Sequence, residues 1–138
     1  MIILDTNVLS EILRPRPDSR VVEWLDAQPE DTLFTTAITV QESFYGAELL
    51  SDSDRKSVLI SRLERLYASI LAGRVLPFDE LDARYTAVFL ARSRAAGRTL
   101  HQADAQIAGI ALRHSATLAT RNTRDFPHAQ LTLCNPWG

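Results

Sequence analysis

The side chains of this 138-residue chain that are best suited to chemistry are acids and one amide that follow apolar runs or open helical patterns. They are Asp5, Glu42, Asp104, Asn122 and Asp125. Open parallel sheets bind ligands beyond the carboxyl ends of their strands, so these side chains share one rim if the strands before them are parallel. Oxygen donors without a Cys or His cluster favour Mg²⁺, or Mn²⁺ as the alternative, over Zn²⁺.

Carboxylates gathered in this way repel one another and need compensation. Two carboxylates ~5 Å apart repel by about 3 kcal/mol at an effective dielectric constant of ~20. Such a cluster persists by taking up protons or by binding a cation. A hard cation with free coordination positions can also take a phosphate oxygen and an attacking water, which is the chemistry of phosphodiester hydrolysis.

Each of these acids also has a structural interpretation. Asp5 can cap a helix, and Glu42 completes the capping-box pattern Thr39-Val40-Gln41-Glu42. Asp104 can lie favourably in the first turn of a helix, and Asp125 can form an Asx turn. Capping explains each residue alone, whereas convergence of all of them on one rim requires a further reason.

The elements that must position these residues alternate along the chain. Apolar or β-branched runs predict strands at residues 1–4, 32–38, 75–78, 117–120 and 131–134. Helical spacing predicts helices at residues 8–13, 18–29, 39–50, 53–72, 79–97 and 103–114. In the fourth helix, one apolar stripe is expected from Leu59, Leu63, Leu66 and Ile70. This alternation predicts a single α/β domain over residues 1–138, with a mainly parallel central sheet and helices on both faces.

Composition excludes several classes of protein. Hydrophobic residues make up 46% and charged residues 23% of the chain, which is ordinary for a globular domain. The apolar runs are shorter than the ~18–20 residues that a membrane span needs, and the lone Cys134 cannot form an internal disulfide. Residues 1–5 lack the basic start of a secretory leader. We therefore expect a cytoplasmic protein.

The charges are distributed unevenly. Residues 1–83 carry eight basic and fifteen acidic residues, whereas residues 84–138 carry seven Arg and two acids. Such asymmetry is a hint of a nucleic-acid partner, although the arginines can equally cover solvated helix faces.

Four segments taken in order resemble the PIN-domain nucleases. They are Ile3-Leu4-Asp5-Thr6-Asn7-Val8, Thr39-Val40-Gln41-Glu42 with Gly46, Ala103-Asp104-Ala105-Gln106-Ile107-Ala108, and Thr120-Arg121-Asn122-Thr123-Arg124-Asp125-Phe126. Within that family the chain is most similar to the VapC toxins of toxin–antitoxin pairs, in the FitB-like subgroup, as is its closing Asn135-Pro136-Trp137. The resemblance covers essentially the whole chain, and the ordered set carries it.

The resemblance implies a metal-dependent ribonuclease that hydrolyses RNA as the toxin of a type II toxin–antitoxin system. It also implies inhibition by a small DNA-binding antitoxin, a homodimer and larger complexes with the antitoxin. By position, Asp5, Glu42 and Asp104 match the family acids that hold the metal, directly or through water. The family's fourth acidic position falls on Asn122, so either Asn122 or Asp125 would supply the fourth ligand.

Further roles follow from these positions. Asp5 and Asp104 are expected to hold the metal, and Glu42 to complete the site or to orient the attacking water. Thr6, Asn7 and Thr120 are candidates for fixing the Asp5 carboxylate or for contacting metal-bound water. Arg121 and Arg124 could contact RNA phosphates, or they could be ordinary solvated arginines.

Other residues and other functions remain open at this point. His101 could be a metal ligand or a polar residue at a helix start, and His114 and His128 are expected at the surface. The stripe on the helix at residues 53–72, with residues 21–25, could form a groove for an antitoxin helix or simply pack in the core.

One alternative function is a catalytically inactive PIN-fold module that acts only through its antitoxin–DNA complex. A phosphatase with an aspartyl nucleophile fits less well, since it usually needs a second Asp where this chain has Asn7.

Overall fold

Short parallel strands form the centre of the fold. The computed structural model describes residues 1–126 and 131–138, and within them the sheet has five strands. These are β1 (Ile2–Leu4), β2 (Leu33–Thr36), β3 (Val75–Leu76), β4 (Thr117–Ala119) and β5 (Thr132–Cys134). Their order is β3-β2-β1-β4-β5, and all neighbouring pairs are parallel. The predicted parallel sheet is therefore confirmed, with β1 at its centre.

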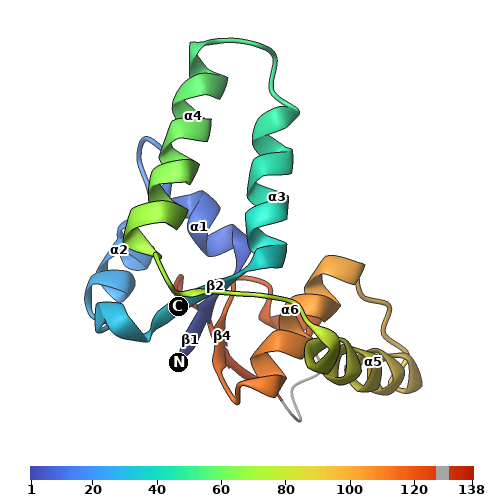
Figure 1. The fold of residues 1–138 in the computed structure, drawn as a ribbon. Helices are drawn as coiled ribbons and strands as arrows, with labels where there is room; N and C mark the ends of the chain where they lie inside the picture. The colour runs from blue at the N-terminus through green and yellow to red at the C-terminus, as the bar shows by residue number, and fades with distance from the viewer. Residues whose placement is uncertain (127–130) are drawn as a thin grey trace.

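Six α-helices surround this sheet in the described part of the chain (Figure 1). They are α1 (Thr6–Ile12), α2 (Ser19–Asp26), α3 (Ala37–Glu48), α4 (Asp54–Arg65), α5 (Glu80–Ala95) and α6 (Gln102–Arg113). Three shorter helical turns lie at Glu30–Thr32, Leu66–Ile70 and Thr123–Asp125. None of the helices in this part of the chain has the length and apolar content that crossing a bilayer requires.

The core has two halves because the sheet is covered on both faces. In β1, Ile3 packs in the half that also contains Ile107 and Ile110 of α6, and the next residue, Leu4, packs in the half with Val8 of α1. Successive side chains of a strand point to opposite faces, so a strand covered on both sides needs an uninterrupted apolar run. That requirement explains the sequence Ile2-Ile3-Leu4.

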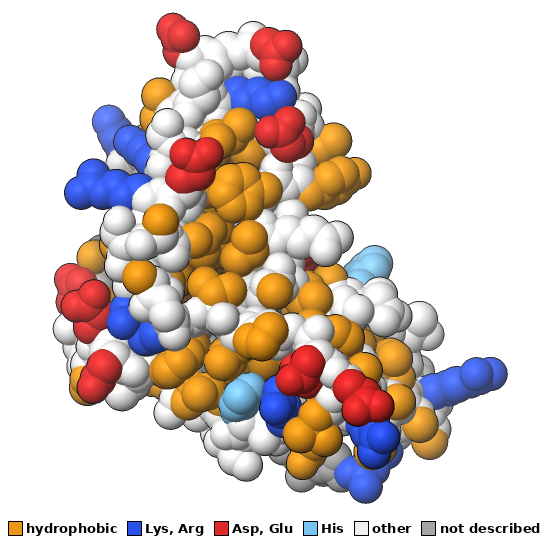
Figure 2. Space-filling view, in the orientation of Figure 1, with side chains coloured by type: hydrophobic (Ala, Val, Ile, Leu, Met, Phe, Trp, Pro, Cys, Tyr) orange, Lys and Arg blue, Asp and Glu red, His pale blue; other side chains and the backbone are white. Residues whose placement is uncertain are grey.

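Helices α3 and α4 project from the sheet as a two-helix arm (Figure 1). Hydrophobic side chains gather in the hollow between them (Figure 2). Each helix has a hydroxyl cap at its start: the Thr36 side chain accepts from the Thr39 N–H, and the Ser53 side chain accepts from the Lys56 N–H.

The prediction of one long helix over residues 53–72 is wrong in its second half. After Arg65 the chain makes a π-helical turn, Leu66–Ile70, in which the Leu71 N–H donates to the Leu66 carbonyl at 2.8 Å. This wider turn shifts the helical register. Leu66 and Leu71 enter the core, whereas Ile70 is 51% exposed and leaves the predicted stripe.

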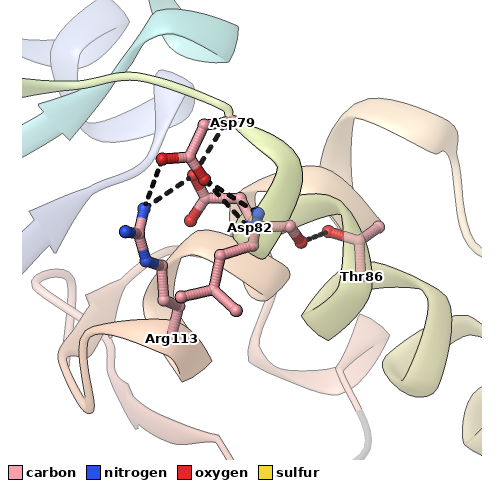
Figure 3. Close-up of polar contacts among 5 residues, drawn as sticks. Asp79, Asp82, Thr86 and Arg113 are labelled. Atoms are coloured by element: carbon pink, nitrogen blue, oxygen red, sulfur yellow. Dashed lines mark hydrogen bonds and ion pairs between the residues drawn. The ribbon is translucent and has the colours of Figure 1, made fainter.

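An ion-pair cluster around the buried Asp82 joins the start of α5 to the end of α6 (Figure 3). One guanidinium nitrogen of Arg113 lies 3.1 Å from a carboxylate oxygen of Asp79 and 3.1 Å from one of Asp82. Asp82 is fully buried, and it completes a capping box with Asp79. Nearby, a Cβ on Gly109 would lie 1.9 Å from the Thr86 hydroxyl, so only glycine permits this close approach of α6 to α5.

The histidines differ partly from expectation. His101 is the N-cap residue of α6, where its side chain makes no capping hydrogen bond. His114 was expected at the surface, but this C-cap residue of α6 is half-buried, and its Nε2 is enclosed. The prediction for His128 lies outside the described residues.

Candidate active site

The three predicted acids line one cavity of about 410 Å³. Asp5 directly follows β1 and is the N-cap of α1. Glu42 comes from α3, which follows β2, and Asp104 lies in the first turn of α6. The parallel order β2-β1-β4 places the ends of these strands at one rim, so residues far apart in the sequence meet there.

Asp5 lies at the centre of a hydrogen-bond network. It is 4% exposed, and its Oδ1 accepts from the Thr6 N–H at 2.8 Å. Its Oδ2 accepts from the Thr120 hydroxyl at 2.7 Å and from the Asn7 amide at 3.3 Å. The three residues predicted to fix this carboxylate therefore all contact it.

Glu42 does not close a capping box. Helix α3 begins at Ala37 after the N-cap Thr36, three residues earlier than the predicted cap Thr39. Glu42 thus lies beyond the first turn, and its Oε1 accepts from the Thr6 hydroxyl at 2.6 Å. Thr6 links two of the acids, through its N–H to Asp5 and through its hydroxyl to Glu42.

Burial is the main cause of the raised pKa values of Asp5 and Asp104. It raises the pKa of Asp5 to about 6, with a further rise from the charges of Asp104 and Glu42 and a partial offset from the Thr120 and Thr6 hydrogen bonds. Burial also raises the pKa of Asp104, and the charge of Glu42 adds to the rise. The repulsion expected from the sequence is present, but loss of hydration exceeds it for Asp5, because this residue follows the central strand β1 and is only 4% exposed.

The chemistry of this site fits an oxygen-preferring cation. None of the ion pairs within residues 1–126 and 131–138 involves Asp5, Glu42 or Asp104. In the same residues, no group of three or more His, Cys, Asp or Glu side chains is arranged so that it could hold a metal ion by itself. Mg²⁺ uses few direct carboxylates and keeps several waters, so a cavity lined by acids suits it without a closed ligand cage.

The two candidates for the fourth position lie in different places. Asn122 lines the same cavity as the three acids. Asp125 lines a neighbouring cavity of about 270 Å³, together with His101 and Asp104, and its charge raises the pKa of Asp104. Asp104 therefore forms the wall between the two cavities.

The two arginines predicted to contact phosphate also differ. Arg121 lines the cavity of the three acids. Arg124 is exposed, and among the described residues it is absent from that cavity wall. Its backbone carbonyl accepts from the Arg98 guanidinium.

Sequence reasoning missed four residues of the cavity wall: Ser10, Glu11, Arg14 and Trp137. Ser10 and Glu11 follow Asn7 at helical spacing on α1, and Arg14 lies just beyond its end, which is a signal that could have been used. Glu11 is 6% exposed and lies 3.5 Å from the Arg14 guanidinium. Trp137 comes from the end of the chain, and no local spacing connects it to the other residues.

Comparisons with known proteins agree with this fold and site. The model of the PIN domain matches residues 2–130. Toxin FitB of Neisseria gonorrhoeae is 44% identical over 137 residues, covering 99% of each chain. VapC ribonuclease Y4jK of Sinorhizobium fredii is 42% identical over 137 residues, covering 99% of this chain and 98% of its own. A structure of FitAB bound to an IR36 DNA fragment superposes with a TM-score of 0.93 and 43% identity, covering 100% of this chain and 96% of the other.

The chain belongs to the PIN-domain family. The prediction of this family was carried by the four ordered sequence segments that contain Asp5, Glu42, Asp104 and Asn122. Within the family its relatives are FitB and VapC toxins of toxin–antitoxin pairs, and the predicted resemblance to that group is confirmed. A crystal structure of FitAcB from Neisseria gonorrhoeae, at 46% identity and a TM-score of 0.88, agrees with the same grouping.

Proposed function

We propose that this chain is the ribonuclease toxin of a toxin–antitoxin pair, acts in the cytoplasm and uses Mg²⁺ or Mn²⁺ to hydrolyse RNA phosphodiester bonds. The observation that supports this proposal best is the cavity of three acids, none of which forms an ion pair with a basic side chain within residues 1–126 and 131–138. Asp5 is held there at a raised pKa by burial, and such a carboxylate gains most from a bound cation.

The acids have distinct roles in this proposal. Asp5 and Asp104 would hold the cation, and Glu42 would either ligate it through water or orient the attacking water. The Asn122 amide oxygen would supply the fourth ligand, since Asn122 shares the cavity. When bound, the cation supplies Lewis-acid activation of the phosphate and lowers the pKa of water.

Neighbouring residues hold these groups in place. Thr120 and Asn7 fix Oδ2 of Asp5, and Thr6 fixes Asp5 relative to Glu42. Partners of this kind commonly change metal affinity or activity by about 10–100-fold when they are removed. Arg121 contacts an RNA phosphate, which positions the strand without reading its sequence.

The antitoxin binds, in this proposal, in the groove between α3 and α4. That groove has a volume of about 540 Å³, and its apolar lining includes Leu13, Val58, Leu59 and Leu63. Glu42 lines it as well, so an apolar helix docked there would lie next to the catalytic acids. The relatives FitAB and FitAcB are complexes by name. The groove differs from the predicted one, which paired this stripe with residues 21–25 of α2.

The chain also forms a homodimer in this proposal. Leu81, Tyr85 and Val88 lie at helical spacing on α5 and are 45%, 41% and 50% exposed. A second copy that covers this face would remove it from water. Sedimentation of the purified chain should give twice the 15.4 kDa mass of the monomer.

The test is cleavage of a mixed-sequence RNA oligonucleotide by purified protein with and without Mn²⁺. We expect cleavage with the metal, none in excess EDTA, and a loss of at least ~100-fold in Asp5→Asn and Asp104→Asn. Asp31→Asn, at an exposed position outside the cavity, is the matched control and should cleave normally. Intact RNA at all protein and Mn²⁺ concentrations would favour an inactive binding module, and cleavage by both variants would overturn the assignment of the site.

A further inference from the structure

Arg121 and Trp137 form a contact at the rim of the cavity that the roles above do not use. The guanidinium carbon of Arg121 lies 5.1 Å from the ring centroid of Trp137, and both residues line the cavity. The backbone N–H of Arg121 also donates to the Asn7 side-chain oxygen at 3.3 Å. The backbone of Arg121 is therefore held by Asn7, and its guanidinium is held by Trp137.

The tryptophan is itself rigidly held. Trp137 is 6% exposed and packs in the core half that contains Leu4 and Val8. Its backbone N–H donates to the Asn135 side chain at 3.0 Å, which shapes the closing turn Asn135-Pro136-Trp137. A ring fixed in this way offers a flat surface in a defined orientation.

The contact determines which part of the guanidinium is available. A cation–π contact places the cation over the face of the aromatic ring and needs no guanidinium N–H as a hydrogen-bond donor to an oxygen, whereas carboxylates and phosphates accept hydrogen bonds from those N–H groups. Within the described residues Arg121 makes no ion pair, although three acids line the same cavity; Arg14, the other basic residue there, is paired with Glu11. The guanidinium N–H groups of Arg121 are consequently free for a phosphate.

We propose that Trp137 is a positioning residue that holds the Arg121 guanidinium against its ring, so that the N–H groups of the guanidinium bind a phosphate of the RNA. The ring also keeps a long basic side chain from pairing with Asp5, Glu42 or Asp104 in place of a cation. This inference rests on the proposed ribonuclease function, and it adds the end of the chain to the RNA-binding surface.

The test is a double-mutant cycle on the full-length protein. It compares wild type, Arg121→Gln, Trp137→Leu and the double variant, with Trp137→Phe as a milder change that preserves an aromatic ring. Trp24→Leu is the matched control, because Trp24 packs against the same core half but is outside the cavity wall. For each protein, kcat and KM are measured on a fluorogenic mixed-sequence RNA oligonucleotide in Mn²⁺ over a range of salt concentrations, and unfolding in urea gives the folded fraction.

We expect Arg121→Gln and Trp137→Leu each to raise KM by about threefold to tenfold with little change in kcat. Each should also reduce the dependence of log KM on log salt by about 0.7, the value for one phosphate contact on a single strand. The double variant should be no worse than Arg121→Gln alone, Trp137→Phe should be intermediate, and Trp24→Leu should retain the wild-type salt slope. A purely structural role for Trp137 would lower stability and leave the salt slope unchanged.

Two outcomes would overturn the inference: additive losses in the double variant, or a normal salt slope in Trp137→Leu. Failure of the proposed function is distinguishable, because wild type would then cleave nothing. In that case the same cycle is measured as binding of the oligonucleotide by fluorescence anisotropy in EDTA. Coupling between Arg121 and Trp137 would then support the phosphate contact, and its absence would contradict it.

Discussion

Two clusters of acids in this molecule each include an acid at a helix start, Asp79 in one and Asp5 in the other, and they are compensated in different ways. Asp79 and Asp82 share Arg113 at the junction of α5 and α6 (Figure 3), and hydrogen bonds and that charge hold the pKa of Asp79 below its usual value. Asp5 faces further acids in its cavity, and its pKa rises to about 6. A buried acid that is paired with an arginine, such as Asp82, therefore does not indicate a metal site. A buried acid that has no ion pair within the described residues, such as Asp5, does.

Asp79, Asp82 and Arg113 form what we call the compensated cluster. The largest expected effect comes from removing its positive charge. Arg113→Met leaves the fully buried Asp82 carboxylate without a counter-charge, and an uncompensated buried charge costs about 3 kcal/mol. Urea unfolding should show this loss, and the additional change Asp82→Asn should recover part of it. RNA cleavage per folded molecule should stay at the wild-type level. An unchanged midpoint in Arg113→Met would show that the two clusters do not differ in the way described.

Removing a charge from the cavity of Asp5, Glu42 and Asp104 should have the opposite effect on stability. Asp5→Asn removes a charge that burial disfavours, so the metal-free variant should be more stable than wild type at pH 7 by up to about 3 kcal/mol. Denaturant unfolding in EDTA measures this gain. Mn²⁺ should stabilise wild type more than the variant, because only wild type retains all three acids. A loss of stability in the metal-free variant would contradict the account.

The pH dependence of that gain has a definite direction. The folded pKa of Asp5, about 6, lies above its ordinary value of 3.8, so between these values the folded state binds more protons than the unfolded state. The contribution of Asp5 to stability is therefore fully present below about pH 4 and is lost as the pH rises through about 6. Asp79 behaves oppositely: its contribution is present at neutral pH and is lost in acid. Wild type and Asp5→Asn should have similar stability at pH 4 and should diverge toward pH 7; a constant difference would refute this.

A smaller effect is expected from the hydroxyl that connects two acids. Thr6→Val removes the 2.6 Å hydrogen bond to Glu42 but keeps the backbone N–H that binds Asp5. We expect about a tenfold loss of kcat/KM, with rescue by Thr6→Ser, which restores the hydroxyl. Thr86→Val, which loses a hydroxyl next to the compensated cluster, should lower stability and leave kcat/KM unchanged. Equal kinetics in Thr6→Val and Thr6→Ser would exclude this role.

Much of the fold was predictable because local patterns determine it. Buried parallel strands need apolar runs such as Ile2-Ile3-Leu4, and helices need a 3.6-residue period. The three acids could be predicted as a group because each follows a strand or opens a helix. The sequence does not contain the order of the strands, so the meeting of Asn7 with Thr120, 113 positions apart, could be expected only through the family resemblance.

The errors and omissions have physical causes. The π-helical turn after Arg65 preserves the apolar composition and changes only the register, so Ile70 looked like a core residue. The cap of α3 was misplaced because Thr36 and Thr39 are both good caps, and the end of β2 selects the first of them. The contact of Arg121 with Trp137 joins a loop to the closing turn, and no periodicity records such a pair.

The most direct test of the central claim is anomalous diffraction from crystals of the wild-type protein soaked in Mn²⁺. We predict an anomalous peak in the cavity of Asp5, Glu42 and Asp104, bound by at least two of these carboxylates, and none beside Asp79 and Asp82, where Arg113 already supplies the positive charge. A saturating soak that leaves the cavity without a peak, or that places the ion at the Arg113 cluster, would contradict the account.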